Sequence, residues 1–143
     1  MSFIIKPMSP IHYDDVYSLW NSIEGMGLDP LDDNLDSIRR FLAMNPGLNY
    51  VATVENKIVG VIMCGFDGRR ATIYHAAVAP NHRNQGIGRA LLDKLESMLR
   101  AKGITKGRLL AFKSNQCATL FWQQAGWHLQ EQLNYFSKQF VTE

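Results

Sequence analysis

Two glycines lie at the start of an amphipathic helical pattern. Of all residues in this chain, their spacing most clearly indicates a binding site. Gly86 and Gly88 lie in the stretch VAPNHRNQGIGRALL, residues 78–92, directly after a basic cluster. Glycine has no Cβ, so a turn built from it lets a ligand touch the backbone. The free N–H groups at a helix start and the positive end of the helix attract anions, and phosphate uses such a site best. The stretch therefore predicts a phosphate cradle, to which Arg83 and Arg89 add charge.

A plain alternative exists for the same glycines, because Gly-x-Gly before a helix also occurs as a flexible turn. Two familiar phosphate motifs do not fit the stretch. The dinucleotide-binding pattern needs a third glycine where Leu91 stands, and the Walker pattern needs glycine, lysine and a hydroxyl residue in a row. A cradle of another type and a turn without a ligand are the two interpretations of this stretch on its own.

The elements that must position the cradle follow from the periodicity of the apolar residues. The pattern predicts a strand, two helices, three strands, a helix, a buried strand, a helix and two final strands. Tight breaks at Asn56-Lys57 and Asp67-Gly68 join the three central strands as an antiparallel meander. The expected ranges are strands at 3–6, 48–55, 58–66, 71–79 and 107–112, helices opening at Ser9-Pro10, near 35 and at Gly86, a helix at 115–125, and a strand pair within 127–140 that turns near Asn134.

Length and composition fit one globular domain, residues 1–143. The chain has 143 residues, 46% of them apolar, and no run of about 18 apolar residues that would span a membrane. Its N-terminus lacks the apolar core of a signal peptide, so we expect a cytoplasmic protein. A net charge of +2 argues against nucleic acid as a partner, and Cys64 and Cys117 have no metal-ligand spacing. We expect reduced thiols and no metal.

Charge is distributed unevenly along the chain. The acidic segment, residues 24–36, contains five acidic side chains and no basic one, whereas residues 69–89 contain four arginines and no acid. The first region is suited to attract cations and the second anions. The alternative is that Asp32 or Asp33 caps a helix and the remaining acids are solvated surface.

The run Arg83-Asn84-Gln85-Gly86-Ile87-Gly88 resembles the Arg/Gln-x-x-Gly-x-Gly/Ala signature of the GNAT superfamily of acyl-CoA-dependent N-acetyltransferases. A second stretch, NQCATLFWQQAGW at 115–127, is similar to the family's late segment Asn-x-x-Ala-x-x-Phe-Tyr-x-x-x-Gly-Phe. The order of elements matches too, and small stand-alone bacterial members are the most similar. The resemblance implies an α+β GNAT fold: a mixed, mostly antiparallel sheet of six to seven strands, splayed between the fourth and fifth strands and flanked by about four helices.

The resemblance also implies acetyl-CoA as the co-substrate. The backbone from Arg83 through Arg89 is expected to hold its pyrophosphate, and the pantetheine arm to pair like a strand with the end of the fourth strand. Asn115 is expected to bond the arm or the neighbouring backbone, or simply to cap its helix, and these roles are compatible. The expected cofactor-binding residues are Ala76, Ala77, Val78, Arg83, Asn84, Gln85, Gly86, Ile87, Gly88, Arg89, Asn115, Phe121 and Trp122.

Transfer to an amine also requires a base, because an unperturbed lysine-type amine has a pKa of about 10.4 and arrives as ammonium. Many family members use a carboxylate on the fourth strand as the base and the tyrosine of the Phe-Tyr pair as the acid. Here His75 stands at the first place and Trp122 at the second. An indole N–H donates a hydrogen bond but delivers no proton in this pH range.

The missing tyrosine leaves the general acid open among Tyr74, Tyr135, Cys117 and a water. The candidate catalytic residues are His75 as the base and Tyr135 as one replacement for the acid. Structural alternatives exist for the two departures from the family pattern. On a regular strand His75 shares a face with Ile73 and Ala77, where a histidine is more often structural. Trp122 completes an apolar helical stripe with Ala118, Phe121 and Ala125.

These residues predict an N-acetyltransferase that passes an acetyl group from acetyl-CoA to a primary amine by direct attack in a ternary complex. The alternative is an acyl-CoA-binding sensor or partner module with little or no turnover, and a nucleotide-phosphate-binding protein is a third interpretation. The acceptor is expected to be a small-molecule amine, or a peptide N-terminus or lysine. The early helices cap the acceptor side in relatives, so the acidic segment, residues 24–36, is expected to steer a cationic acceptor. No nucleic acid or membrane partner is expected, and a homodimer is left open.

Overall fold

Five strands form a single sheet in the computed structural model, which describes residues 2–141. Their order across the sheet follows the chain: β1 (Ile4–Pro7), β2 (Tyr50–Val54), β3 (Lys57–Phe66), β4 (Ala71–Val78) and β5 (Gly107–Leu109). The first four strands pair antiparallel, and β5 runs parallel to β4. The predicted α+β class and the mixed, mostly antiparallel sheet are confirmed, with five strands in the described residues where six to seven were expected.

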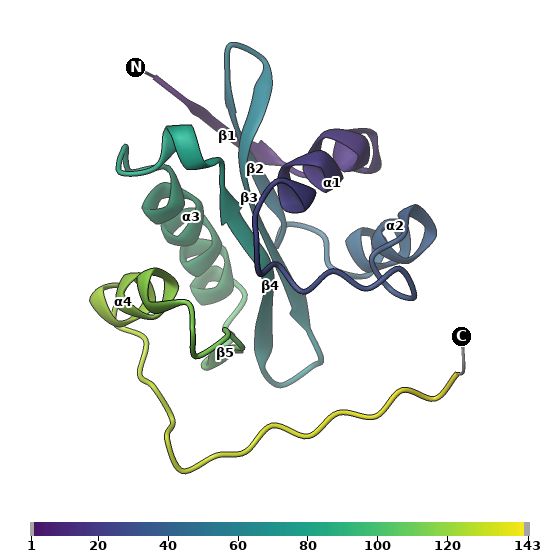
Figure 1. Ribbon diagram of the computed structural model, residues 1–143, viewed down its shortest axis with the longest axis vertical. Helices are drawn as coiled ribbons and strands as arrows, with labels where there is room; N and C mark the ends of the chain where they lie inside the picture. The colour runs from purple at the N-terminus through teal and green to yellow at the C-terminus, as the bar shows by residue number, and fades with distance from the viewer. Residues whose placement is uncertain (1, 142–143) are drawn as a thin grey trace. The chain divides into compact units, whose positions relative to one another are not determined.

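Helices cover both faces of this sheet. α1 (Tyr13–Asn21) follows the 3₁₀ turn η1 (Pro10–His12), and with α2 (Leu35–Met44) it lies on one face, whereas α3 (Ile87–Ala101) lies on the other (Figure 1). These helices begin within a few residues of the predicted openings, because capping residues, proline and glycine mark the helix starts.

The core between α1 and the sheet contains the apolar side predicted for this helix. Val16 and Trp20 of α1 are fully buried in one cluster with Val61 and Met63 of β3. On the other face of the sheet, α3 lies very close to β3. A Cβ on Gly60 of β3 would lie 3.1 Å from side-chain atoms of α3. Glycine at this position therefore lets α3 pack tightly against β3.

The chain divides into two compact units, Met1–Phe112 and Lys113–Glu143. The first contains the sheet with α1, α2 and α3, and the second contains α4 (Gln116–Gln124). The prediction of a single domain over residues 1–143 stays a prediction.

Two expectations for the later strands are wrong. The strand predicted at 107–112 is only three residues long, and Leu110 and Phe112 beyond it are 63% and 60% exposed. Residues 127–140, predicted as a strand pair, form no strand in the described part of the second unit. Alternating apolar residues favour a strand only where an edge pairs with it, and Leu133 and Phe136 are 68% and 87% exposed here.

Candidate active site

The phosphate cradle predicted from the glycines lies between the end of β4 and the start of α3, after the 3₁₀ turn η2 (Pro80–His82). Gly86 is the N-cap of α3 and has a left-handed φ of +84°, and Asn84 has a φ of +62°. A Cβ on Gly86 would meet no atom within 4 Å, so the turn opens onto free space. α3 has no side-chain cap and no acid in its first turn. Its first N–H groups and positive end are therefore available to an anion.

The two arginines of the cradle are each engaged by a neighbour. The Arg83 Nε donates to the Val78 carbonyl at 3.2 Å, which ties the loop to the last residue of β4. The Arg89 Nε lies 3.0 Å from a carboxylate oxygen of Asp93, one turn along α3, and these side chains are 54% and 60% exposed. An exposed pair of this kind contributes at most ~1 kcal/mol, so Arg89 can turn to a phosphate at small cost.

β4 has an unpaired edge beside the cradle. β5 pairs with β4 only from Ala71 to Ile73, so within the described first unit the edge from Tyr74 onward faces no strand. The other edge stays paired with β3 as far as Val78. This separation is the splay predicted between the fourth and fifth strands. It leaves backbone groups near Ala76 to Val78 without a strand partner, as an extended ligand requires.

A β-bulge in β4 determines how His75 is presented. The register of β3 and β4 shifts between Val61 and Met63, so that His75 and Ala76 lie together opposite Ile62. His75 adopts a φ of +45°, a conformation that is uncommon for a residue other than glycine. Bulges re-aim side chains and are frequent next to active sites.

The bulge also changes the face on which His75 lies. Regular alternation predicted a face shared with Ile73 and Ala77. The His75 ring packs edge-on against Trp20 of α1, with ring centroids 4.9 Å apart, on the face where Ala77 also packs against the α1 cluster. Ile73 instead pairs with Cys64 on the face away from α1, so the prediction holds for Ala77 and is wrong for Ile73. The Trp20 indole N–H donates to the His75 carbonyl at 3.1 Å, which gives that carbonyl a partner at the bulge.

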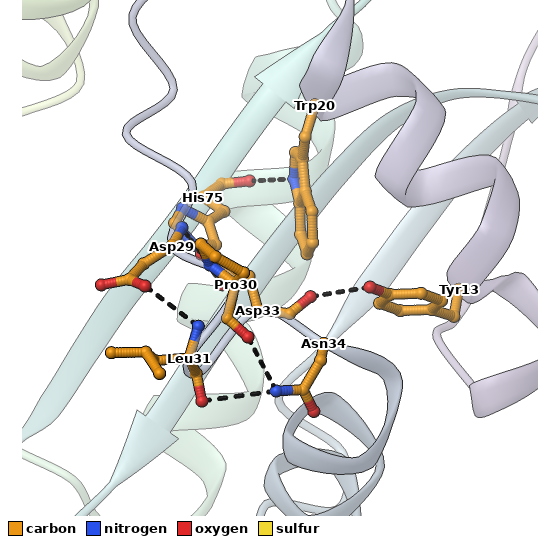
Figure 2. A network of polar contacts seen from close by, with 8 residues as sticks. All are labelled: Tyr13, Trp20, Asp29, Pro30, Leu31, Asp33, Asn34 and His75. Atoms are coloured by element: carbon orange, nitrogen blue, oxygen red, sulfur yellow. Dashed lines mark hydrogen bonds and ion pairs between the residues drawn. The ribbon is translucent and has the colours of Figure 1, made fainter. Parts of the chain in front are cut away.

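Asp33 of the acidic segment binds the His75 ring (Figure 2). Its Oδ1 lies 2.8 Å from His75 Nε2, and its Oδ2 accepts the backbone N–H of Asp29 at 2.8 Å. The Asp33 carbonyl accepts the Tyr13 hydroxyl at 2.7 Å. Asp33 is 6% exposed and the His75 side chain 20% exposed. The pair is thus held, largely buried, by α1, the acidic segment and β4.

Hydrogen bonding sets the ionisation of Asp33. Burial alone would raise the pKa of its carboxyl group, but hydrogen bonds from His75 and the Asp29 N–H, together with the attraction of His75, hold that pKa below its usual range. Asp32 shows the opposite direction, because burial and the carboxylates of Asp33 and Asp29 raise the pKa of Asp32. Of these two neighbours, Asp33 stays ionised to lower pH.

The alternative interpretation, in which Asp32 or Asp33 caps a helix, is wrong. Asn34 is the N-cap of α2, and its side-chain oxygen accepts the Ser37 N–H at 2.9 Å. Asp36, in the first turn of α2, is an exposed acid whose side chain is 80% accessible. The acidic segment therefore contains both a solvated acid and a buried one, and the buried one is bound to the predicted base.

The predicted residues of the late segment belong to the second unit. Asn115 caps α4, and its side-chain oxygen accepts the Ala118 N–H at 3.0 Å. Trp122 packs edge-on against Phe121 and Trp127, with ring centroids 5.1 and 5.5 Å apart. Within this unit Asn115 is a cap and Trp122 a packing residue. The roles of Asn115, Phe121 and Trp122 toward coenzyme A stay predictions.

The candidate acids differ in their surroundings. Tyr74 of β4 is 46% exposed and its ring lies 5.6 Å from that of Phe41. Tyr135 is 69% exposed and Cys117 is exposed, both in the second unit. Cys64 is a free, buried thiol, and burial raises its pKa to about 12, so it stays protonated. Tyr74 is thus the candidate acid on the same strand as His75.

Sequence reasoning missed the contacts that Trp20 and Asp33 make with His75. Trp20 is recognisable only as an apolar helix residue, although a buried indole N–H usually has an acceptor. Asp33 lies 42 residues from His75 in sequence, and no local pattern links the two.

The described residues contain no helix long and apolar enough to cross a membrane. They also hold no group of three or more His, Cys, Asp or Glu side chains suited to a metal ion.

Comparisons with known proteins agree on the family of this chain. Residues 13–127 match the Acetyltransferase (GNAT) family. The acetyltransferase SG1711 of Sodalis glossinidius is 30% identical over 131 residues, which cover 92% of this chain and 91% of that protein. The PaiA N-acetyltransferase of Thermoplasma acidophilum, solved with coenzyme A, is 16% identical with a TM-score of 0.77, over 87% of this chain and 89% of that one. An aminoglycoside acetyltransferase from an uncultured soil metagenomic sample is 22% identical with a TM-score of 0.73, over 97% of both chains.

Proposed function

The chain belongs to the acetyltransferase (GNAT) family, and we propose that it transfers the acetyl group of acetyl-CoA to a primary amine in a ternary complex. One observation carries the proposal. An anion cradle at the start of α3, an unpaired edge of β4 and the His75–Asp33 pair lie along β4 and the turn that follows it. Acetyl-CoA has a matching part for each feature: its pyrophosphate for the cradle, its extended arm for the free edge of β4, and its thioester for the reaction near His75.

In the proposed complex the first N–H groups of α3 and the positive helix end hold the pyrophosphate. Gly86 and Gly88 let the phosphate oxygens reach the backbone, and Arg83 and Arg89 add charge. The pantetheine arm lies along the free edge of β4 near Ala76 to Val78. N–H groups of that edge also stabilise the negative charge that develops on the thioester oxygen.

His75 is proposed as the general base. It takes a proton from the acceptor ammonium, and the neutral amine then attacks the thioester carbonyl carbon. A C–N bond forms, and the amine nitrogen then gives up a second proton. The C–S bond breaks, and the electron pair of that bond leaves on sulfur. The thiolate takes up a proton to give free coenzyme A, so the reaction releases one proton to solvent overall.

Because the Trp122 indole cannot supply the proton for the thiolate, the proton must come from water or from a tyrosine. A thiolate with an unperturbed pKa near 8.5 leaves readily, so water suffices in part. Tyr74 is the phenol on the strand that carries His75, and Tyr135 is the candidate predicted from the sequence. Substituting each tyrosine by phenylalanine distinguishes them, because only the proton donor lowers kcat when its hydroxyl is removed.

The acceptor is proposed to be a cationic amine. One similar fold belongs to an aminoglycoside acetyltransferase, and the sequence predicted either a small amine or a peptide N-terminus or lysine. Thiol release from acetyl-CoA, measured over a panel of aminoglycosides, polyamines, amino acids and short peptides, tests the proposal. Mass spectrometry of the product must show one added acetyl group on nitrogen.

His75→Gln is the sharpest variant for this test. Glutamine keeps an N–H that can donate to Asp33, but it has no basic nitrogen. We expect kcat to fall by ~10²-fold or more while the Kd of coenzyme A stays nearly unchanged, since a base acts in the transition state. Coenzyme A binding without acetyl transfer to any amine would contradict the proposed function.

A further inference from the structure

Asp33 is a buried acid within the acidic segment. Its residue is 6% exposed, while the Asp36 side chain on the next turn is 80% exposed. Both carboxylate oxygens of Asp33 are in use, since Oδ1 faces His75 Nε2 and Oδ2 accepts the Asp29 N–H, each at 2.8 Å. The carboxylate therefore contacts the His75 ring and a backbone N–H, and little of it contacts solvent.

The Asp33 contact determines which nitrogen of His75 carries hydrogen. An ionised carboxylate accepts hydrogen bonds and donates none, so the contact requires a hydrogen on Nε2. A neutral imidazole then has its free electron pair on Nδ1. Within the described residues of the first unit, Nδ1 of His75 has no hydrogen-bond partner, so this nitrogen is free to accept a proton.

We infer that Asp33 is a positioning residue that holds His75 in the Nε2–H tautomer, so that Nδ1 is the nitrogen that accepts the proton of the acceptor ammonium. This inference rests on the proposed function, in which His75 is the base. An N–H bond of the ammonium breaks, an N–H bond forms on Nδ1, and the electron pair stays on the amine nitrogen. The imidazolium that results is paired with the Asp33 carboxylate, which stabilises the charge where it forms.

Neighbouring contacts hold both members of the pair in place. The Trp20 indole N–H binds the His75 carbonyl at 3.1 Å, and the Tyr13 hydroxyl binds the Asp33 carbonyl at 2.7 Å. The Asp29 N–H fixes the second carboxylate oxygen at 2.8 Å. The carboxylate therefore cannot rotate away from His75 without losing a largely buried hydrogen bond.

The Asp29 contact makes Asp33→Asn an informative change. A backbone N–H cannot accept a hydrogen bond, so the amide oxygen of the asparagine must face Asp29. The amide NH₂ then faces His75 Nε2, which has to accept and therefore lose its hydrogen. The variant is thus expected to move the hydrogen to Nδ1 and remove the proton-accepting nitrogen without removing the imidazole.

Long-range ¹H–¹⁵N correlation spectra of the full chain without substrate report which ring nitrogen is protonated. The chain has four histidines, and the His75 signals are identified as those missing from His75→Gln. At about pH 8, where an ordinary histidine is neutral, the wild type should show hydrogen on Nε2 and Asp33→Asn hydrogen on Nδ1. The control is Asp15→Asn, which makes the same charge change on an exposed residue of α1.

The kinetic expectation is a loss in kcat. Asp33→Asn should lower kcat by ~10²-fold or more and change the KM of the amine and the Kd of coenzyme A by less than ~3-fold. Asp15→Asn should match the wild type in tautomer and rate. An Nδ1–H tautomer in the wild type, an unchanged tautomer in Asp33→Asn, or a full kcat in that variant would each overturn the inference. If the wild type acetylates no amine, the proposed function fails, and the spectra still decide whether Asp33 sets the tautomer.

Discussion

The starts of α2 and α3 are closed in different ways. At α2 the Asn34 side chain accepts the Ser37 N–H at 2.9 Å, and Asp36 adds a negative charge in the first turn. At α3 the N-cap is Gly86, which has no side chain to offer, and the first turn contains no acid. The first helix start is satisfied by its own chain. The second keeps its N–H groups and positive field unpaired, and under the proposed function they hold the phosphate of coenzyme A.

The loops that lead into these two helices differ in the same way. The acidic segment before α2 directs one carboxylate inward, where Asp33 binds His75 at 2.8 Å. The loop before α3 directs its glycine turn outward, where a Cβ on Gly86 would find free space. One loop therefore organises the proposed base, and the other is open to the co-substrate.

An acid placed in the first turn of α3, where α2 has Asp36, is expected to have the largest effect on coenzyme A binding. Gly88 is the second residue of α3, as Asp36 is of α2. Gly88→Asp should raise the Kd of coenzyme A by ~10²-fold or more, because a carboxylate repels phosphate and a side chain fills the cradle. The free energy of unfolding of the free protein should stay equal or rise by up to ~1 kcal/mol. Calorimetric titration and urea unfolding measure both, and an unchanged Kd in the folded variant would disprove the cradle.

Two glycines at opposite ends of α3 separate backbone strain from ligand binding. Gly86 and Gly103 have φ values of +84° and +76°, and a Cβ at either would meet no atom within 4 Å. Gly86→Val and Gly103→Val should lose similar stability, on the order of 1–3 kcal/mol. Only Gly86→Val should weaken coenzyme A binding, by ~10-fold or more. Equal losses of affinity in the two variants would assign the effect to strain in the helix.

The buried carboxylate of Asp33 should contribute to the loss of stability at acid pH. The pKa of Asp33 is lowered in the folded state, so its contribution is complete above the unfolded value of about 3.9 and is lost as pH falls through the folded pKa. The groups that face it are His75, Asp29, Asp32 and Tyr13. Urea unfolding between about pH 6 and pH 3 should therefore show a shallower loss of stability for Asp33→Asn than for the wild type. Asp36→Asn, which changes an exposed acid, should keep the wild-type slope.

The exposed acids of the acidic segment should have the smallest effect. Asp32→Asn combined with Asp36→Asn is expected to lower kcat/KM for a cationic amine by less than ~5-fold at low salt. The difference should disappear at about 0.5 M salt, because exposed charges are screened. Steady-state kinetics at two salt concentrations with a cationic and a neutral amine give the comparison. Equal rates for wild type and variant at low salt would show that these acids do not steer the acceptor.

Most of the fold and half of the site could be predicted from the sequence, because the signals are local. The cradle lies within residues 83–89, so the positive φ of Gly86, the missing cap and the helix start all follow from neighbouring residues. The central meander was predicted for the same reason, although Glu55 and Asn56 form the turn between β2 and β3, with φ values of +51° and +66°, one residue before the predicted break at Asn56-Lys57. Turns and helix caps depend on a few consecutive residues, so they can be predicted from the sequence alone.

Only the tertiary structure decided the features that depend on distant partners. Regular alternation placed His75 and Ile73 on one face, which is wrong, because the bulge arises from pairing with β3 and is held by Trp20 of α1. The pairing of Asp33 with His75 joins residues 42 positions apart. The strand pair expected within 127–140 is wrong for a related reason: a strand needs an edge to pair with, and no pattern within the segment supplies one. Neighbouring residues determined the open glycine turn at the start of α3, and long-range packing determined that Asp33 meets Nε2 of His75, because only folding brings these two residues together.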